Sequence, residues 1–190
     1  MPTQPTDPSM GPSSLPAPWR LDYLERLDKE EKQAKVPQPG SGSFLLDYWL
    51  APERDVQNHV IVRTDQGMIL LNAYPYAAGH VLVALGDPRP SLLDYAPEQR
   101  LSLWGLVVAA TAMVERTLEP QGINTGINQG RAAGAGIPQH LHVHLVPRWG
   151  GDTNFITTIG QVRVIPASLD AMAARYRAVW QRMIASGFTI

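Results

Sequence analysis

Three short apolar runs follow one another in the first half of the chain. They span His59 to Thr64, Met68 to Ala73 and His80 to Leu85, and all are rich in Val, Ile or Leu. Runs of this length and composition, bounded by turn residues, are typical of β-strands. Asp65-Gln66-Gly67 separates the first two runs and predicts a tight hairpin turn. We therefore expect an antiparallel meander of three strands.

The apolar spacing takes a helical period between Pro97 and Leu118. One stripe along this segment consists of Leu103, Val107, Ala110 and Val114. Residues three or four positions apart lie on the same face of an α-helix, and Pro120 ends the element. A second helix is expected from Ser168, the predicted N-cap, to about Ser186.

The N-terminal part of the chain has a different character. Residues 1–18 are rich in Pro, Ser and Thr and contain no apolar stretch, so they predict a disordered tail rather than a secretory signal. Trp19 to about Lys35 has helical spacing, and linker-like sequence follows from Val36 through Pro52 and Asp55. We therefore expect a tail over 1–18, a helix and linker over 19–57, and the main domain over 58–190.

A second group of strands is expected in the C-terminal half. Ile123 to Gln129 alternates apolar and polar residues, as a half-buried strand does, and His140 to Val146 alternates in the same way. A loop rich in glycine and alanine, Gly130 to Pro138, joins them. This order of elements predicts an α+β domain built on an antiparallel sheet flanked by helices.

Histidine occupies every second position in the last of these strands. His140, His142 and His144 are three of the five histidines in the chain. Alternate side chains of a strand point to the same face, so these imidazoles share one face at a spacing of about 7 Å, and the intervening aliphatic residues face the core. Three histidines beside a glycine-rich loop indicate ligand binding or chemistry.

Two kinds of chemistry fit this arrangement. Alternating histidines can bind a transition metal, but that interpretation calls for neighbouring carboxylates, and the flanking residues offer no obvious one. A neutral imidazole can instead attack phosphorus and form a covalent intermediate. The glycine loop would then supply backbone N–H groups, and Arg131 and Arg148, which bracket the site in the sequence, would supply charge. The second interpretation uses more of the sequence.

Composition narrows the class of protein. The 190 residues include 16 Lys and Arg against 17 Asp and Glu. This balance gives no basic field that would gather nucleic acid or an anionic membrane, so an anionic ligand must be held locally. The absence of cysteine excludes disulfides and cysteine-ligated zinc, and it fits a reducing cytoplasm. The most apolar window, Leu101 to Val114, is shorter than the roughly 20 residues that span a bilayer.

The segment His140-Leu141-His142-Val143-His144-Leu145-Val146 resembles the signature of the histidine-triad (HIT) family. Leu71 to Tyr76 and Gly79 to Val83 resemble the family's strand pair, which carries ribose contacts and a further histidine. Asn128-Gln129-Gly130 resembles its phosphate-site motif. The resemblance covers roughly Asn58 to Pro166. It implies a nucleotide-processing enzyme with a HIT-like antiparallel sheet, which forms a homodimer.

Two further segments, Gly130 to Gly136 and Pro147 to Phe155, are similar to the bacterial diadenosine tetraphosphate phosphorylase-like branch of this family. The similarity implies cleavage of diadenosine polyphosphates with inorganic phosphate as the acceptor. Alternatives are hydrolysis of nucleoside phosphoramidates or adenylyl conjugates, and a nucleotide-binding module without turnover. No cofactor is expected, although a divalent cation can accompany the substrate polyphosphate.

The resemblance also implies roles for particular residues. His142 would be the nucleophile, and His140 would support its orientation. His144 and His80 would contact the α-phosphate, and Asn72 would hold the ribose hydroxyls. The other substrate-binding candidates are Asn128, Arg131, Gly134, Gly136 and Gln139.

The chain departs from the family pattern in two places. Gly136 and Ile137 stand where many members carry Gln and Ser or Thr, which leaves the leaving-group end of the site unassigned; Gln139 is a partial substitute. The stretch from Gly42 to Leu46 lacks the Cys-x-x-Cys of related proteins, so we expect no structural zinc. Packing by Phe44, Leu45, Tyr48 and Trp49 is the expected replacement.

Overall fold

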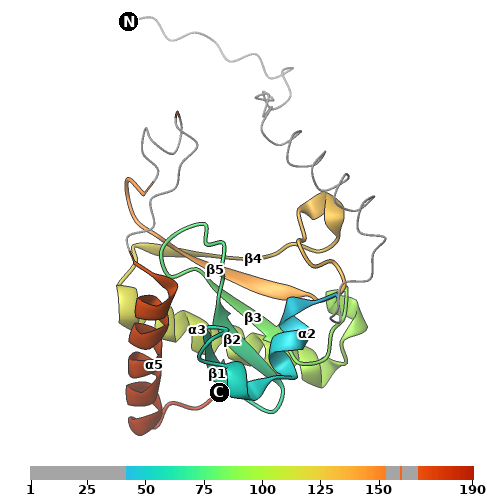
Figure 1. Ribbon diagram of the computed structural model, residues 1–190, viewed down its shortest axis with the longest axis horizontal. Coiled ribbons are helices and arrows are strands. Elements are labelled where there is room, and N and C mark those ends of the chain that lie inside the picture. Colours follow the sequence, from blue (N-terminus) through green and yellow to red (C-terminus); the bar gives the residue numbers. More distant parts are fainter. Residues whose placement is uncertain (1–41, 153–158, 160–166) are drawn as a thin grey trace, which may run out of the picture. The chain divides into compact units, whose positions relative to one another are not determined.

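The computed structural model describes residues 42–152, 159 and 167–190 (Figure 1). The predicted tail over 1–18, the predicted helix from Trp19 to Lys35 and the first six residues of the linker that follows it lie outside these residues, as does part of the segment from Pro147 to Phe155. Residues from Gly40 onward belong to one compact unit.

A five-stranded antiparallel sheet with the order β1-β2-β3-β5-β4 forms the centre of this unit. Its strands are β1 (Val60–Arg63), β2 (Gly67–Leu71), β3 (Val81–Leu85), β4 (Gly122–Ile127) and β5 (His142–Arg148). The predicted α+β class and the predicted meander of β1, β2 and β3 are confirmed. Because β5 lies between β3 and β4, the histidine strand is interior to the sheet and β4 is an edge strand.

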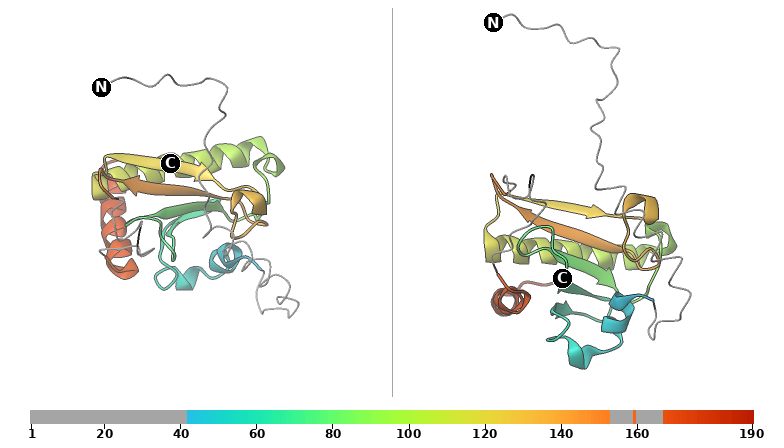
Figure 2. Two further views of the ribbon diagram at one scale, coloured as in Figure 1. Left: turned by 90° about the horizontal axis from the view of Figure 1, so that it is seen from above. Right: turned by 45° about the horizontal axis from the view of Figure 1, so that its top comes forward.

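The two long helices, α3 (Pro97–Leu118) and α5 (Leu169–Ala185), pack against one face of the sheet. The core there combines apolar residues of both helices with inward-facing strand residues such as Val83, Val143 and Leu145. In Figure 1, α3 runs behind the strands, and Figure 2 shows it from two further sides. The helical stripe predicted from the sequence is buried as expected, since Leu103, Val107, Ala110 and Val114 all belong to this core.

By length and composition alone, α3 is the one helix among the described residues that would be able to cross a membrane. The sequence argument from length was therefore too strict, because the helix extends for 22 residues. Eight of these residues are buried, and they contact the sheet and α5. Packing within the protein thus accounts for the apolar character of this helix.

A short helix, α2 (Phe44–Trp49), covers the opposite face of the sheet. The sequence pattern predicted only linker here, because six residues are too few to show a helical period. Leu45 is fully buried among Val60, Met68, Leu70, Leu82 and other residues of the strands. Tyr48 and Trp49 pack against this cluster as expected, whereas Phe44 is 41% exposed.

Arg63 fastens α2 to the sheet. Its guanidinium donates to the carbonyl oxygens of Trp49 (2.9 Å) and Tyr48 (2.8 Å) and forms a two-point ion pair with Asp55. It also lies 5.0 Å from the centre of the Trp49 ring. The last carbonyl groups of α2 therefore receive charge-assisted donors from β1.

We expect Arg63→Ala to lower the free energy of unfolding by about 1–3 kcal/mol, because several part-buried hydrogen bonds lose their donor. Arg63→Lys should restore little, since an ammonium group lacks the planar fork. Urea unfolding of the three proteins provides the measurement. Equal unfolding free energies for wild type and Arg63→Ala would show that α2 is held by apolar packing alone.

Candidate active site

Strand register places two of the histidines on the face of the sheet that α2 covers. His142 pairs with Ala84 and His144 pairs with Leu82, and both partners belong to the apolar cluster on the α2 side. Val143 and Leu145 belong to the core under α3 and α5. The alternation predicted from the sequence is thus confirmed for these residues. His140 lies just outside the strand, where Leu141 N–H donates to Arg89 O instead of to β3.

The protonation of His142 follows from its backbone partner. Its Nδ1 lies 2.9 Å from the carbonyl oxygen of His140. A carbonyl oxygen only accepts, so Nδ1 carries the proton and Nε2 of the neutral ring keeps its lone pair. Burial lowers the pKa of His142, although the backbone hydrogen bond opposes this effect. His142 is 6% exposed, and its neutral ring keeps an unprotonated Nε2.

His140 is fully buried and therefore cannot touch a substrate directly. Its Nε2 donates to Leu85 O at 2.8 Å, and its Nδ1 lies 2.9 Å from the hydroxyl oxygen of Ser43. Burial is the main cause that lowers the pKa of His140. Both ring nitrogens are thus engaged, and the ring supports the backbone carbonyl that holds His142.

His144 is oriented by a second chain of hydrogen bonds, which starts at the loop between β2 and β3. The backbone N–H of Tyr76 donates to His80 Nδ1 (3.1 Å), so His80 carries its proton on Nε2 and donates to His144 Nδ1 (3.0 Å). His144 consequently presents an Nε2–H donor. Burial, followed by the proximity of His142, lowers the pKa of His144 to about 4.

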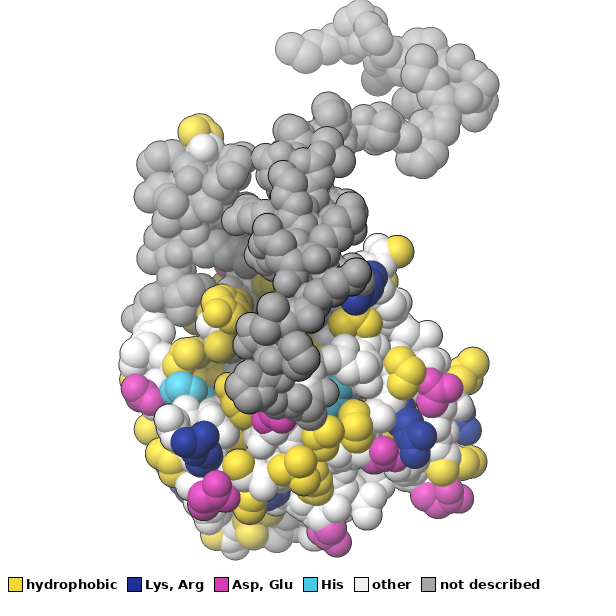
Figure 3. Space-filling view, turned by 45° about the vertical axis from the view of Figure 1, so that its right-hand side comes forward, with side chains coloured by type: hydrophobic (Ala, Val, Ile, Leu, Met, Phe, Trp, Pro, Cys, Tyr) yellow, Lys and Arg dark blue, Asp and Glu magenta, His cyan; other side chains and the backbone are white. Residues whose placement is uncertain are grey.

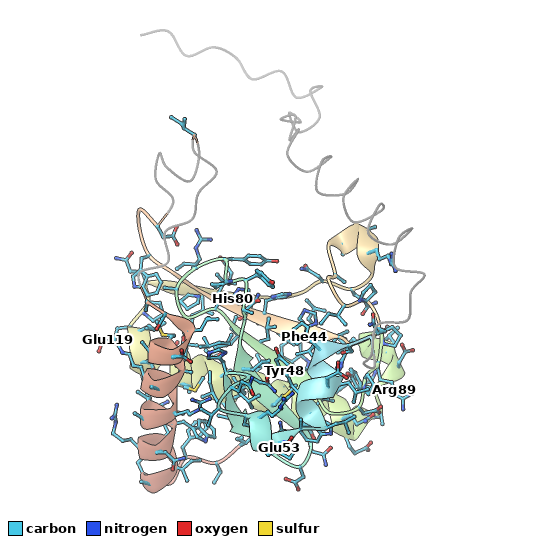
Figure 4. All side chains as sticks on the ribbon, viewed as in Figure 1. Phe44, Tyr48, Glu53, His80, Arg89 and Glu119 are labelled. Carbon is cyan, nitrogen blue, oxygen red and sulfur yellow. The ribbon has the colours of Figure 1, made fainter. Side chains whose placement is uncertain are left out.

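The structure corrects the expected role of His80. This residue, labelled in Figure 4, is fully buried just before β3 and is hydrogen-bonded to His144. Its burial leaves no surface for a direct contact with a phosphate, and its Nε2 is hydrogen-bonded to His144. Tyr76, which the sequence analysis did not single out as a site residue, stacks on His144 with ring centres 5.9 Å apart and planes 21° apart.

Asn72 lies at the edge of this cluster, where it is partly exposed. Its Oδ1 accepts from the backbone N–H of Tyr74 (2.9 Å), and its Nδ2 lies 3.3 Å from His80 Nδ1. The amide is therefore held in a fixed orientation beside the histidines, and its exposed part is available to a ligand.

On the other side of the histidines, the edge strand β4 lines the same face. Gly126 pairs with His144, and Ile127 pairs with Val143; the partly exposed Asn128 is the first residue after β4. A side chain at Gly126 would meet nothing within 4 Å. The surface of β4 at Gly126, across from His144, is therefore uncovered.

The glycine loop is a compact turn and differs from the cradle expected from the sequence. A short 3-10 turn spans Arg131–Ala133, and the N–H groups of Ala133, Gly134 and Ala135 donate to carbonyls within the loop. The Gly134 N–H is therefore engaged internally. Gly136 is exposed, with open space where a side chain would stand, and Arg131 is exposed on the turn.

Two other candidates have partners away from the histidine face. The Gln139 amide donates to Gly42 O, so it joins the loop to the start of α2. Arg148 forms a two-point ion pair with Asp152 and also donates to Asn124. The structure thus brings His140, His142, His144, His80 and Asn72 together, places Asn128 just after the edge strand, and gives Gln139 and Arg148 structural contacts.

Ser43 is the site residue that the sequence interpretation missed, because it lay in a stretch interpreted as linker. No sequence signal links Ser43 to His140, 97 positions away; only the fold brings them together. Among the described residues, no group of three or more His, Cys, Asp or Glu side chains is arranged to hold a metal ion. On the face seen in Figure 3, histidine side chains reach the surface among hydrophobic ones.

A buried strand of neutral histidines on an antiparallel sheet, with Nε2 of His142 unprotonated, defines a site of the histidine-triad type. The similarity of the sequence to a known protein family agrees with this geometry. The HIT domain family matches residues 53–151, and the chain belongs to this family.

Several relatives and solved structures resemble the chain. It is 34% identical over 166 residues to AP-4-A phosphorylase of Mycobacterium tuberculosis. The aligned residues make up 87% of this chain and 83% of that protein. It is 33% identical over 97 residues to the asymmetrical bis(5'-nucleosyl)-tetraphosphatase of Schizosaccharomyces pombe, over 51% of this chain and 53% of that protein. The fold resembles a Zn-bound histidine triad family protein from Mycobacterium smegmatis (TM-score 0.60, 23% identity, 74% of this chain and 96% of that one).

The lowered histidine pKa values make stability depend on pH. In the unfolded chain His144 titrates near 6.5, whereas burial lowers its pKa to about 4 in the folded protein. Below pH 6.5 the unfolded state therefore binds more protons, and stability is lost as the pH falls toward 4. We expect a lower free energy of unfolding at about pH 5 than at about pH 7.5, and a smaller difference in His144→Asn. An unchanged pH dependence in this variant would contradict the assignment.

Proposed function

We propose that the protein is an enzyme that cleaves dinucleoside polyphosphates, with diadenosine tetraphosphate as the representative substrate and inorganic phosphate as acceptor. The observation that carries this proposal is the His142 ring, which is neutral, buried and held with Nε2 unprotonated. The activities named for the Mycobacterium tuberculosis and Schizosaccharomyces pombe relatives support the class of substrate.

The reaction proceeds in two displacements. The lone pair of His142 Nε2 attacks the α-phosphorus, a P–N bond forms, and the P–O bond to the leaving polyphosphate breaks. Phosphate oxygen then attacks the same phosphorus, the P–N bond breaks, and the ring returns to its neutral state. For diadenosine tetraphosphate the first product is ATP and the second is ADP. The proton on Nδ1 stays in its hydrogen bond to His140 O, which stabilises the ring as positive charge develops.

Other residues bind and orient the substrate in this scheme. The His144 Nε2–H donates to an α-phosphoryl oxygen, and Asn128 donates to the same group from the edge strand. Asn72 holds the ribose hydroxyls. Exposed Gly136 leaves room for the polyphosphate, and Arg131 and the turn at Gly134 lie along its path. The reaction requires no cofactor, and a divalent cation enters with the polyphosphate.

The decisive test incubates the protein with diadenosine tetraphosphate, with and without inorganic phosphate, and separates the products. We expect ADP and ATP only when phosphate is present. His142→Ala should reduce turnover to the uncatalysed background, because no other group replaces the nucleophile. His59→Ala is the matched control, since His59 pairs with Asp170 on α5 and should retain full activity.

The other outcomes assign a different reaction. AMP and ATP without phosphate would identify a hydrolase. AMP binding without turnover of diadenosine tetraphosphate would contradict the phosphorylase assignment. Phosphoramidates and adenylyl conjugates would then be the substrates to test. An increase in intact protein mass by one nucleotidyl group, absent in His142→Ala, would identify the covalent intermediate directly.

The proposal includes a cytoplasmic homodimer. Leu101, Trp104 and Val108 form an apolar stripe on α3 and are 74%, 44% and 63% exposed. Positions spaced by three and four residues share one helix face. Strand β4 is one of the two edge strands of the sheet. A second copy would cover both features through a two-fold axis.

Light scattering tests this assembly. Wild type should have the mass of two chains, and the double variant Leu101→Lys, Val108→Lys should have the mass of one, because two charges would enter an apolar interface. Val56→Lys is the control, since Val56 is 72% exposed on a turn remote in sequence from α3. A monomeric wild type would refute the dimer without affecting the reaction proposal.

A further inference from the structure

The hydroxyl of Ser43 makes two hydrogen bonds at the start of α2. As the N-cap, its Oγ accepts from the backbone N–H of Leu46 at 3.3 Å. The same oxygen lies 2.9 Å from His140 Nδ1. Ser43 is 2% exposed and His140 is fully buried, so water does not compete for either group.

The donor and the acceptor in each hydrogen bond follow from whether the partner group is able to donate. Leu85 O lies 2.8 Å from His140 Nε2 and only accepts, so Nε2 carries the proton of the neutral ring. Nδ1 is then an acceptor, and the Ser43 hydroxyl donates to it. Because that hydroxyl uses its proton on His140 and a lone pair on Leu46, a single arrangement satisfies all three groups.

His140 links these hydrogen bonds to His142, the proposed nucleophile. The two ring bonds of His140 reach Ser43 and Leu85, 97 and 55 positions away in the sequence, and they fix its place between α2 and the end of β3. The carbonyl oxygen of the same residue accepts from His142 Nδ1. A shift of the His140 ring would therefore move the acceptor that keeps the His142 proton away from Nε2.

We propose that Ser43 is a positioning residue for the nucleophile: its hydroxyl fixes His140, whose carbonyl holds His142 with Nε2 free to attack. α2 is then part of the catalytic apparatus, although none of its residues touches the substrate. The inference rests on the proposed function, because it assigns His142 the attacking role.

A purely structural role for Ser43 as a helix cap is the competing explanation, and two substitutions separate the roles. Ser43→Ala and Ser43→Gly both remove the donor to His140, but glycine is nearly as good an N-cap as serine whereas alanine is not. Loss of the His140 bond affects both variants equally, whereas loss of the cap affects mainly Ser43→Ala. Ser168→Ala is a matched control, since Ser168 caps α5 with the same kind of bond, to Ala171 N–H at 3.2 Å.

We expect kcat to fall about tenfold in both Ser43 variants, the effect of one hydrogen bond of ordinary strength. KM should stay within about twofold, because neither Ser43 nor His140 contacts the substrate. Ser168→Ala should keep the wild-type kcat. Wild-type kcat in folded Ser43→Gly would overturn the inference, and so would a loss confined to Ser43→Ala.

A second measurement does not depend on turnover. The ¹⁵N chemical shifts of the His142 ring in wild type should show a proton on Nδ1 and none on Nε2. In Ser43→Gly the shifts should move toward a mixture of the two tautomers. The neighbouring titratable groups Asp87 and His144 are present in both proteins, so they do not account for such a difference. Unaltered shifts would refute the positioning role. If wild type proves inactive on every dinucleoside polyphosphate, the proposed function fails, and the shifts alone still decide the role of Ser43.

Discussion

The hydrogen bond from His142 Nδ1 to the carbonyl oxygen of His140 is the constraint on which the active site depends. A neutral imidazole carries one proton, and its place decides which nitrogen is the nucleophile. The strand by itself does not impose this bond, because it joins a side chain to a backbone group two positions earlier. It forms because His140 leaves the strand ladder and is held at both ring nitrogens by Ser43 and Leu85.

Burial keeps the cluster neutral, and its effect on His142 exceeds the opposing effect of the backbone hydrogen bond. His142 and His144 both have lowered pKa values because desolvation disfavours the charged imidazolium. Their partners are neutral groups: a carbonyl oxygen and the His80 ring. His142 Nε2 therefore keeps its lone pair at neutral pH. The overall charge of the chain is nearly balanced, so an anionic ligand would have to be held by local groups.

The rest of the fold positions the two ends of this hydrogen-bond system. On one side, Tyr176 of α5 donates its hydroxyl to Gly79 O at 2.7 Å, which anchors the residue before His80. Gly79 has a φ of +78°, and a side chain there would collide with Leu118 and Tyr176. On the other side, Arg63 holds α2 against the sheet, and α2 brings Ser43 to His140. The apolar core under α3 supports the sheet that joins both ends.

The sequence by itself determined the sheet, the long helices and the shared face of His142 and His144, because periods of two and of three to four residues are local consequences of backbone geometry. It also identified Asn72, His80 and Asn128, through short motifs that lie near the strand ends. Only the tertiary structure decided that Ser43 belongs to the site, that His80 is buried and hydrogen-bonded to His144, and that the Gly134 N–H is turned into its own loop. These outcomes depend on contacts between residues far apart in the sequence, and on which nitrogen of each neutral imidazole carries its one proton. Neither produces a periodic pattern in the sequence.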